Sequence, residues 1–191
     1  ILMGAGELTV AGGAEGLMDA EFIYNVNQWQ PEVDYQVSGG QGQLRVQQPE
    51  VGNLGSWDNY RYEWRIGLNN EVPMALNVRL GAGEGTLRVA DLALTDLDVR
   101  AGTGKGTIDL AGDWSSDLDV AIEAGVGDIL VTLPRDTGVR VKVEGGLGRV
   151  NAGDLRVDDG AYVNDAYGDS DTTIVVEISG GIGQVTLDVV G

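Results

Sequence analysis

The chain has 191 residues, a length that suits one domain, and 30 Asp and Glu against 12 Lys and Arg give a formal net charge of −18. Such an acidic chain repels phosphate backbones, so its composition argues against nucleic-acid binding. The sequence holds neither Cys nor His. That absence excludes disulfides, zinc thiolates, histidine-ligated metals and Ser-His-Asp hydrolysis.

The first residues, Ile1 to Gly6, already follow a strand-like pattern. We therefore expect a secretion signal or a membrane anchor to precede this sequence. No apolar run is long enough to cross a bilayer. Direct membrane insertion by this segment is therefore not expected.

Residues 1–74 form an irregular, aromatic-rich region in which aromatic side chains alternate with charged ones. Four of these residues are candidates for a platform on which sugars stack: Trp57, Tyr60, Tyr62 and Trp64. The same aromatic stripe also fits a cap over the open end of a stack of repeats. Both interpretations stay open at this point.

A repeat of about 21 residues dominates the chain from residue 75 onward. Five segments share a pattern in which the first, third and fifth positions are apolar, namely 76–80, 97–101, 118–122, 139–143 and 174–178. This alternation predicts strands with one buried face. Stacked coils of such strands form a parallel β-solenoid, because no single coil can bury its own apolar face.

Glycine follows the same repeat. The second glycine of Gly-x-Gly falls at Gly6, Gly42, Gly83, Gly104, Gly127, Gly148 and Gly183. Dinucleotide binding requires one such motif before a helix, whereas seven copies among strands predict corners of the coils.

An acidic insertion around residues 153–172 interrupts the coils. Its carboxylates are hard oxygen ligands of the kind that calcium prefers. The candidate ligands are Asp158, Asp159, Asp165, Asp169 and Asp171. Their spacing matches neither the EF-hand loop nor the nonapeptide calcium repeat, and a solvated loop explains the same residues.

Asp98 and Asp119 occupy equivalent positions in successive 21-residue coils. In-register stacking would place them about 4.8 Å apart. Neighbouring carboxylates can act as a catalytic acid and base. Arg79, Arg100 and Arg140 flank them, however, and an ordinary charged strand face accounts for the same arrangement.

The sequence resembles the bacterial toast-rack domains, which are related to the C-terminal domain of LiaF-like cell-envelope stress proteins. The resemblance is carried by 4–10 (Gly-Ala-Gly-Glu-Leu-Thr-Val), the segment from Tyr24 to Pro31-Glu32-Val33, 42–46 (Gly-Gln-Leu-Arg-Val), and Leu133-Pro134 followed by Gly138-Val139. It implies a right-handed single-stranded β-helix beside a membrane anchor or signal, and it supplies no catalytic residues or cofactors.

These observations predict a single all-β domain over 1–191, with regular coils over 75–191. We expect a non-enzymatic, extracytoplasmic or membrane-tethered module that binds an envelope protein or itself, and that needs no cofactor. The alternative is a β-helix that binds or cleaves carbohydrate.

Overall fold

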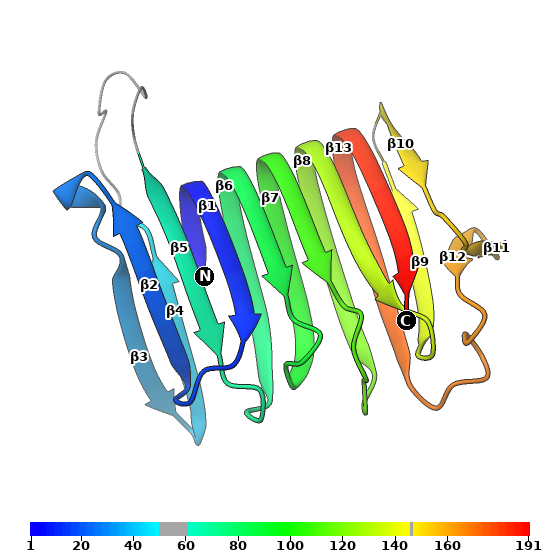
Figure 1. The fold of residues 1–191 in the computed structure, drawn as a ribbon, viewed down its shortest axis with the longest axis horizontal. Coiled ribbons are helices and arrows are strands. Elements are labelled where there is room, and N and C mark those ends of the chain that lie inside the picture. The colour runs from blue at the N-terminus through cyan, green and yellow to red at the C-terminus, as the bar shows by residue number, and fades with distance from the viewer. Residues whose placement is uncertain (50–60, 146) are drawn as a thin grey trace.

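The computed structural model describes residues 1–49, 61–145 and 147–191, and these form an all-β fold around one sheet (Figure 1). In the first half, the elements are β1 (Leu2–Gly12), β2 (Met18–Tyr24), a 3-10 turn η1 (Asn27–Trp29), β3 (Glu32–Ser38), β4 (Gln41–Gln47), β5 (Tyr62–Leu68) and β6 (Met74–Arg88). They are followed by β7 (Leu94–Asp109), β8 (Leu118–Pro134), β9 (Gly138–Glu144), β10 (Leu147–Asn151), β11 (Arg156–Asp158), β12 (Ala161–Val163) and β13 (Thr173–Val190).

Five long strands, β1, β6, β7, β8 and β13, pair in parallel through the middle of the sheet. Each bends over, so that its two limbs lie in front of and behind one another (Figure 1). The predicted alternation is confirmed: Leu76, Val78 and Leu80 are buried, and so are their counterparts Val120 and Ile122 in β8. These side chains and those of the second limbs form one continuous core.

Glycines at the bend lie in register from strand to strand, as in the row Gly6, Gly83, Gly104, Gly127 and Gly183. Gly104 has a φ of 136°, and a Cβ added there would overlap the carbonyl oxygen of Gly83. Only glycine accommodates both conditions. The predicted corner is thus confirmed in the five long strands.

The prediction is wrong for Gly42, which has no positive φ. Gly42 lies in β4, beyond a hairpin turn made by Gly39 and Gly40. Gly148 has no positive φ either, but it pairs with Gly183 of the glycine row, and a Cβ added there would overlap the carbonyl oxygen of Gly183, so the predicted close approach is present.

The spacing between β7 and β8 also differs from the predicted 21 residues. Leu97 pairs with Val120, and Gly104 pairs with Gly127, so this coil advances by 23. The row of glycines fixes the register, and the longer turn after Leu110 takes up the extra residues. Because a shift of two residues keeps the same face inward, strand alternation alone could not detect it.

The expectation of a purely parallel stack is too simple, because the sheet is mixed. Antiparallel pairs join β2 to β5 and β3 to β4 at one end, and join β11 to β12 and β12 to β9 at the other. Moreover, β13 lies between β8 and β9. The segment 139–143 therefore does not stack on 118–122 as its place in the chain suggested.

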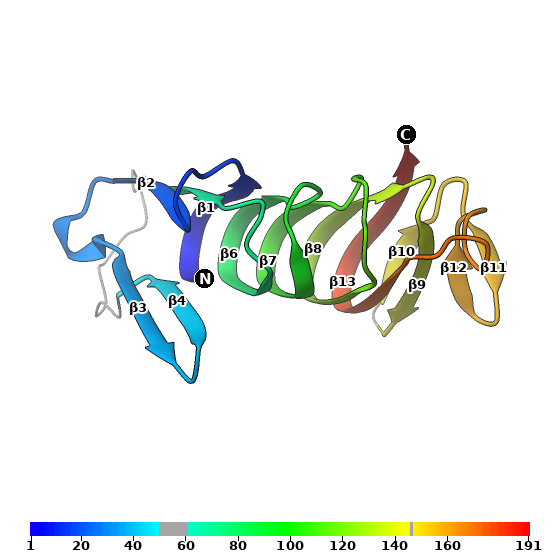
Figure 2. The same cartoon turned by 90° about the horizontal axis from the view of Figure 1, so that it is seen from below.

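The two ends also depart from the row of long strands in space. Figure 2 shows the β3–β4 hairpin projecting from one end and the β11–β12 hairpin closing the other. The described part of the chain contains no helix with the length and apolar character needed to cross a bilayer.

Candidate interaction surfaces

An aromatic cluster fills the end of the fold beside β1. Tyr62 and Trp64 project from β5, with ring centroids 5.6 Å apart. Phe22 of β2 packs edge-on against Trp64 at 5.4 Å, and Trp29 of η1 lies 5.2 Å from Tyr62. Such offset and T-shaped pairs are the arrangements that aromatic quadrupoles favour. The cluster is continuous with the core.

The aromatic cluster is a cap, and neither Tyr62 nor Trp64 can serve as a stacking platform for sugars. Tyr62 and Trp64 are 5% and 1% exposed, whereas a sugar needs an open ring face. The Tyr62 hydroxyl donates a hydrogen bond of 2.7 Å to the carbonyl oxygen of Trp29, and burial raises the pKa of Tyr62 to about 12. Trp57 and Tyr60 lie outside the described residues.

The acidic insertion does not assemble a calcium site in the described structure. Asp158, Asp159, Asp165, Asp169 and Asp171 are all exposed, and within residues 1–49, 61–145 and 147–191 no three acidic side chains converge as metal ligands. Asp158 instead lies 3.8 Å from Arg156 across an ion pair. The insertion forms the β11–β12 hairpin and the turns on either side of it.

The acid pair considered for catalysis is not a pair. Asp98 is aligned with Ala121, and Asp119 with Asp96. The shift of two residues between β7 and β8 is the reason. Asp98 lies beside Arg100 at 3.3 Å, in the charged strand face that the sequence also allowed.

Asn164 is a structural residue that the sequence did not reveal. It is 4% exposed, and its Nδ2 donates to the carbonyl oxygens of Pro134, Arg135 and Thr137 at 3.0, 3.2 and 2.7 Å. Its Oδ1 accepts from the amide of Val139 at 2.9 Å. An Asn between acidic residues looked like part of a solvated loop, and only the folded turn between β8 and β9 gives it these partners.

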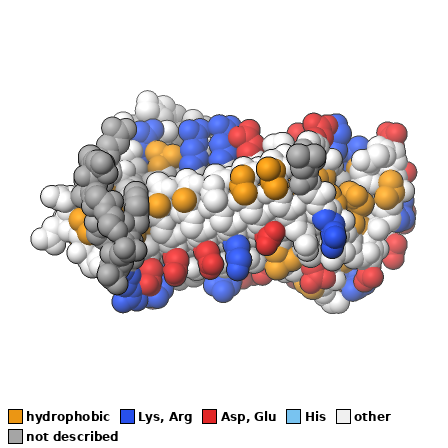
Figure 3. Space-filling view, turned by 90° about the horizontal axis from the view of Figure 1, so that it is seen from above, with side chains coloured by type: hydrophobic (Ala, Val, Ile, Leu, Met, Phe, Trp, Pro, Cys, Tyr) orange, Lys and Arg blue, Asp and Glu red, His pale blue; other side chains and the backbone are white. Residues whose placement is uncertain are grey.

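The outer face of the bends is flat and glycine-rich. Figure 3 shows a pale band along the bends with a row of hydrophobic side chains on it and charged side chains on both sides. Val126 and Ile182 are adjacent in register, directly before Gly127 and Gly183 at the bend, and are 50% and 57% exposed.

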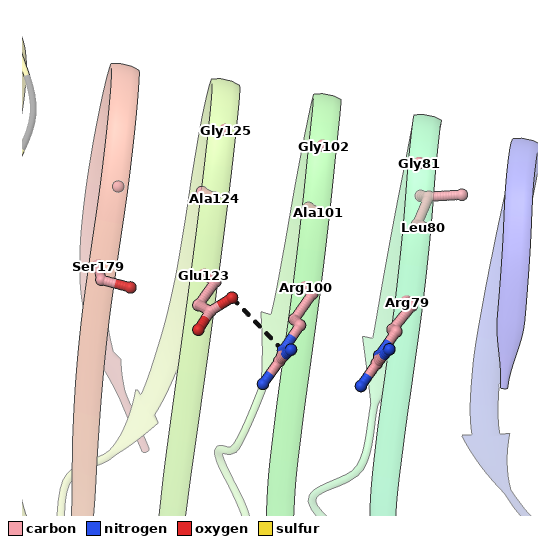
Figure 4. A pocket seen from close by; sticks show the side chains of 11 residues that line it. Arg79, Leu80, Gly81, Arg100, Ala101, Gly102, Glu123, Ala124, Gly125 and Ser179 are labelled. Carbon is pink, nitrogen blue, oxygen red and sulfur yellow. Dashed lines mark ion pairs between the residues drawn. The ribbon is translucent and has the colours of Figure 1, made fainter.

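A shallow groove of about 590 Å³ lies beside this band, over β6, β7, β8 and β13 (Figure 4). Arg79, Arg100, Glu123 and Ser179 project along it from four successive strands (Figure 4). Arg100 and Glu123 form an ion pair of 3.4 Å between two of these strands. Arg79, by contrast, is aligned with Arg100, so the groove carries both like and opposite neighbouring charges.

The β3–β4 hairpin, at the same end of the sheet as the aromatic cluster, presents a row of exposed apolar side chains. Val33, Tyr35 and Val37 alternate along β3 and are 49%, 53% and 65% exposed. Every residue of β3 is exposed. In the sequence this row lies within 32–38 (Glu-Val-Asp-Tyr-Gln-Val-Ser), in the region that was predicted only as irregular and aromatic-rich.

A cleft of about 910 Å³ opens between this hairpin, β5 and the start of β6. Tyr35 and Leu44 line it from the hairpin, Ile66 and Leu68 from β5, and Leu76 from β6. Amide side chains at its rim include that of Gln43. This end of the fold therefore combines an apolar cleft with an exposed strand.

Comparison with known proteins places this fold in a family. The family model for the N-terminal domain of toast_rack (DUF2154) matches residues 1–132. Among solved structures, the crystal structure of a "putative cell adhesion protein" from Clostridium sporogenes ATCC 15579 superposes with a TM-score of 0.94. The two sequences are 38% identical, and the match covers 99% of this chain and 90% of that one.

The search of curated proteins returned no match. The resemblance first seen in the glycine motifs is thus confirmed by a match over more than half of the chain and by a close structural relative. The chain belongs to the toast-rack family.

Proposed function

We propose that this chain is a non-enzymatic interaction module that acts outside the cytoplasm, in adhesion or assembly at the cell surface. The observation that carries the proposal is the likeness, at 38% identity over 99% of the chain, to a protein described as a putative cell adhesion protein. An adhesion module needs a rigid frame that displays a surface, and a sheet with a continuous core supplies such a frame.

The surface chemistry supports the same proposal. Among the described residues, no three acidic side chains converge as metal ligands. The Gly-x-Gly motifs of the long strands serve the close packing of backbones at the bends. Exposed apolar rows, by contrast, lie on the bends and on β3, and exposed apolar patches mark sites of protein association. We assign the whole chain to one domain whose long coils wind right-handed, as the family resemblance implies.

Envelope-stress sensing is the narrower role that the family resemblance suggests, and the partner would then be an envelope protein or a second copy of the chain. In either role the module works on the outer side of the membrane.

Protease treatment of intact cells tests the location. The protein is expressed in its natural full length with an epitope tag at the end of this domain, and intact cells are exposed to a protease that does not cross the membrane. We expect the domain to be lost from intact cells while a cytoplasmic marker survives. Survival of the domain until the cells are lysed would contradict the proposal.

Carbohydrate binding is a second candidate because of the cleft beside β3. Tyr35 is half exposed there, and Gln43 offers an amide at the rim; aromatic faces together with amides suit sugars. Titration of the purified protein with envelope glycans tests this candidate. Binding that is lost on Tyr35→Ala but kept on Tyr167→Ala would support it, whereas no heat or chemical-shift change with any glycan would remove it.

A further inference from the structure

The two edges of the sheet differ in how they are protected. The order of strands ends at β11 on one side and at β3 on the other. An exposed edge strand offers unpaired amides and carbonyls to other chains, and proteins commonly shorten or charge such edges. β11 follows that rule, because it has three residues and Val157 lies between Arg156 and Asp158.

β3 does not follow it. Seven residues pair regularly with β4, without a bulge, and the strand holds neither proline nor a basic side chain. Its two acids are already engaged: Glu32 accepts a hydrogen bond of 2.6 Å from Gln47, and Asp34 accepts one of 2.8 Å from Gln36. No described residue pairs with the outer edge of β3.

One face of β3 is an apolar row. Val33, Tyr35 and Val37 are about half to two thirds exposed, at 49%, 53% and 65%. Opposite them on β4 lie Val46 and Leu44, with Val33 facing Val46 and Tyr35 facing Leu44. The hairpin therefore has a continuous apolar face that ends at an open edge.

We propose that β3 pairs antiparallel with β3 of a second copy of this chain, with Tyr35 at the two-fold axis. In this register every residue meets a compatible one. Directly opposite residues, with the second copy's residue given second, are Glu32 and Ser38, Val33 and Val37, Asp34 and Gln36, and Tyr35 and Tyr35. Apolar and aromatic cross-strand pairs stabilise a sheet, and no like charges lie directly opposite one another.

Neighbouring registers are less favourable. Moving the axis to Asp34 would set two carboxylates directly opposite one another, which destabilises the pair. Moving it by half a step, between Asp34 and Tyr35, would place the apolar rows of the two copies on opposite faces of the joint sheet. The register centred on Tyr35 avoids both faults and pairs all seven residues of β3, one more pair on each side than a register centred on Gln36.

The dimer is weak and depends on salt. A single strand pair buries less surface than a standard stable interface, so we expect a dissociation constant in the micromolar range. Two chains of charge −18 repel one another, and added salt screens that repulsion. Many copies on one surface would convert weak pairing into firm attachment. This deepens the proposed function by naming a second copy as partner.

Sedimentation velocity over a concentration series tests the pairing on purified protein. We expect a monomer–dimer equilibrium that shifts to dimer as salt rises. Val37→Lys adds a charge at an exposed position opposite Gly42 and should weaken the dimer at least about 10-fold. The matched control is Val157→Lys, which places the same charge on the other edge at a 70% exposed valine and should leave the equilibrium unchanged.

Single cysteines test the register, because the chain has none of its own. Tyr35→Cys should form a disulfide-linked dimer under oxidised glutathione, since directly opposite Cβ atoms lie roughly 5 Å apart. Val33→Cys should not link to itself, because its mate in the second copy lies about four residues away, roughly 14 Å. A mixture of Val33→Cys and Val37→Cys should link only as the mixed pair.

A protein that stays monomeric at all concentrations and salt levels would overturn the proposal, as would Val157→Cys linking as fast as Tyr35→Cys. Self-linking of Val33→Cys would overturn the register. Far-ultraviolet circular dichroism should match wild type for every variant, because the altered side chains are exposed. Failure here leaves the protease result on intact cells unaffected, so the two proposals fail separately.

Discussion

The middle of the sheet and its two ends bury apolar surface by different means. In the middle, β6, β7 and β8 repeat one pattern, and each strand buries its aliphatic row against the next. At the ends there is no further coil to cover the last one. The aromatic cluster around Trp64 closes one end, and the β9–β12 hairpins, tied by Asn164, close the other.

β1 and β13 occupy equivalent positions near the two ends of the sheet. β1 and β13, the first and last strands, are interior strands of the sheet. Each is flanked on its outer side by two shorter strands that cover its two limbs separately: β4 and β5 beside β1, and β9 and β10 beside β13. The middle and the ends therefore differ in whether one strand forms both limbs of a coil. In the middle a single strand bends to form both limbs, whereas at each end two separate strands form them.

The largest effect is expected from a substitution in the core of the middle strands. Val120 is 2% exposed and lies between Leu97 and Val176 in the aliphatic row. Val120→Asp would bury a carboxylate without a partner, at a cost of more than about 4 kcal/mol, a large share of a domain's stability. We expect no cooperative unfolding transition in urea when the variant is followed by circular dichroism. Val99→Asp should behave in the same way.

Arg100→Ser is the control, at the outward position next to Val99 on β7. The Arg100 side chain is 45% exposed, and its ion pairs with Asp98 and Glu123 are 3.3 and 3.4 Å long at the surface. Surface ion pairs contribute about 0–1 kcal/mol. A loss as large as that of Val120→Asp would mean that the outward row has a structural role that its exposure does not suggest.

The second prediction separates two contributions to the cost of replacing a glycine, namely steric overlap of the new Cβ and the strain of a positive φ. Gly104→Ala adds a Cβ against the carbonyl of Gly83 at a φ of 136°. An L-residue at positive φ costs about 1–2 kcal/mol, and overpacking adds about 1–3 kcal/mol. We expect a total loss of roughly 3–4 kcal/mol in urea-induced unfolding.

Gly40→Ala in the β3–β4 turn is the matched variant. Gly40 has a φ of 82°, but nothing lies within 4 Å of an added Cβ. It should cost only the conformational part, about 1–2 kcal/mol. Equal losses at the two sites would show that the close approach of the glycine carbonyls in the middle of the sheet adds nothing.

The sequence was informative about the middle because the same requirement recurs there. Alternation in 76–80 and 97–101 identified the buried faces, and the glycine repeat identified the bends. Alternation alone could not establish the register between β7 and β8, because a shift of two residues keeps every side chain on the same face, whereas the 23-residue spacing from Gly104 to Gly127 matches it. The pairing of β13 between β8 and β9 depends on contacts distant in the chain and left no local pattern.

The ends were harder for a related reason. Tyr62 and Trp64 have the alternation of an exposed aromatic stripe. They are buried because Phe22 and Trp29 pack against them, and no residue spacing in the sequence predicts that packing. The exposed β3 was visible as alternation too. Alternation shows that two faces differ, but it does not show whether a neighbour exists to cover the apolar one.

The third prediction breaks the closure of the C-terminal end. Asn164→Ala removes the donor to three carbonyl oxygens and the acceptor for the amide of Val139. Leaving buried backbone groups without partners costs about 1–3 kcal/mol per group, reduced where water enters the space. We expect a net loss of about 2–3 kcal/mol. Hydrogen exchange should accelerate at β9 and β12, and much less at β6 and β7.

Asp165→Ala changes the next residue along the chain and serves as the control, because Asp165 is exposed. It should alter stability by less than about 0.5 kcal/mol. If both variants weaken the protein equally, the turn between β8 and β9 is held by the charge of the insertion and not by the Asn164 amide.

The smallest effect concerns the aromatic cap. Tyr62→Phe removes the hydrogen bond to the Trp29 carbonyl and should cost about 1 kcal/mol, since the ring packing remains. Burial raises the pKa of Tyr62 to about 12, so its contribution is fully present below the unfolded value near pH 10 and is lost as pH rises through about 12. Absorbance at 295 nm should show a late-titrating tyrosine that Tyr62→Phe removes and that Tyr35→Phe, at an exposed position, leaves in place. An unchanged titration curve in Tyr62→Phe would mean that the cap admits water, and that the ends of the sheet are less well closed than its middle.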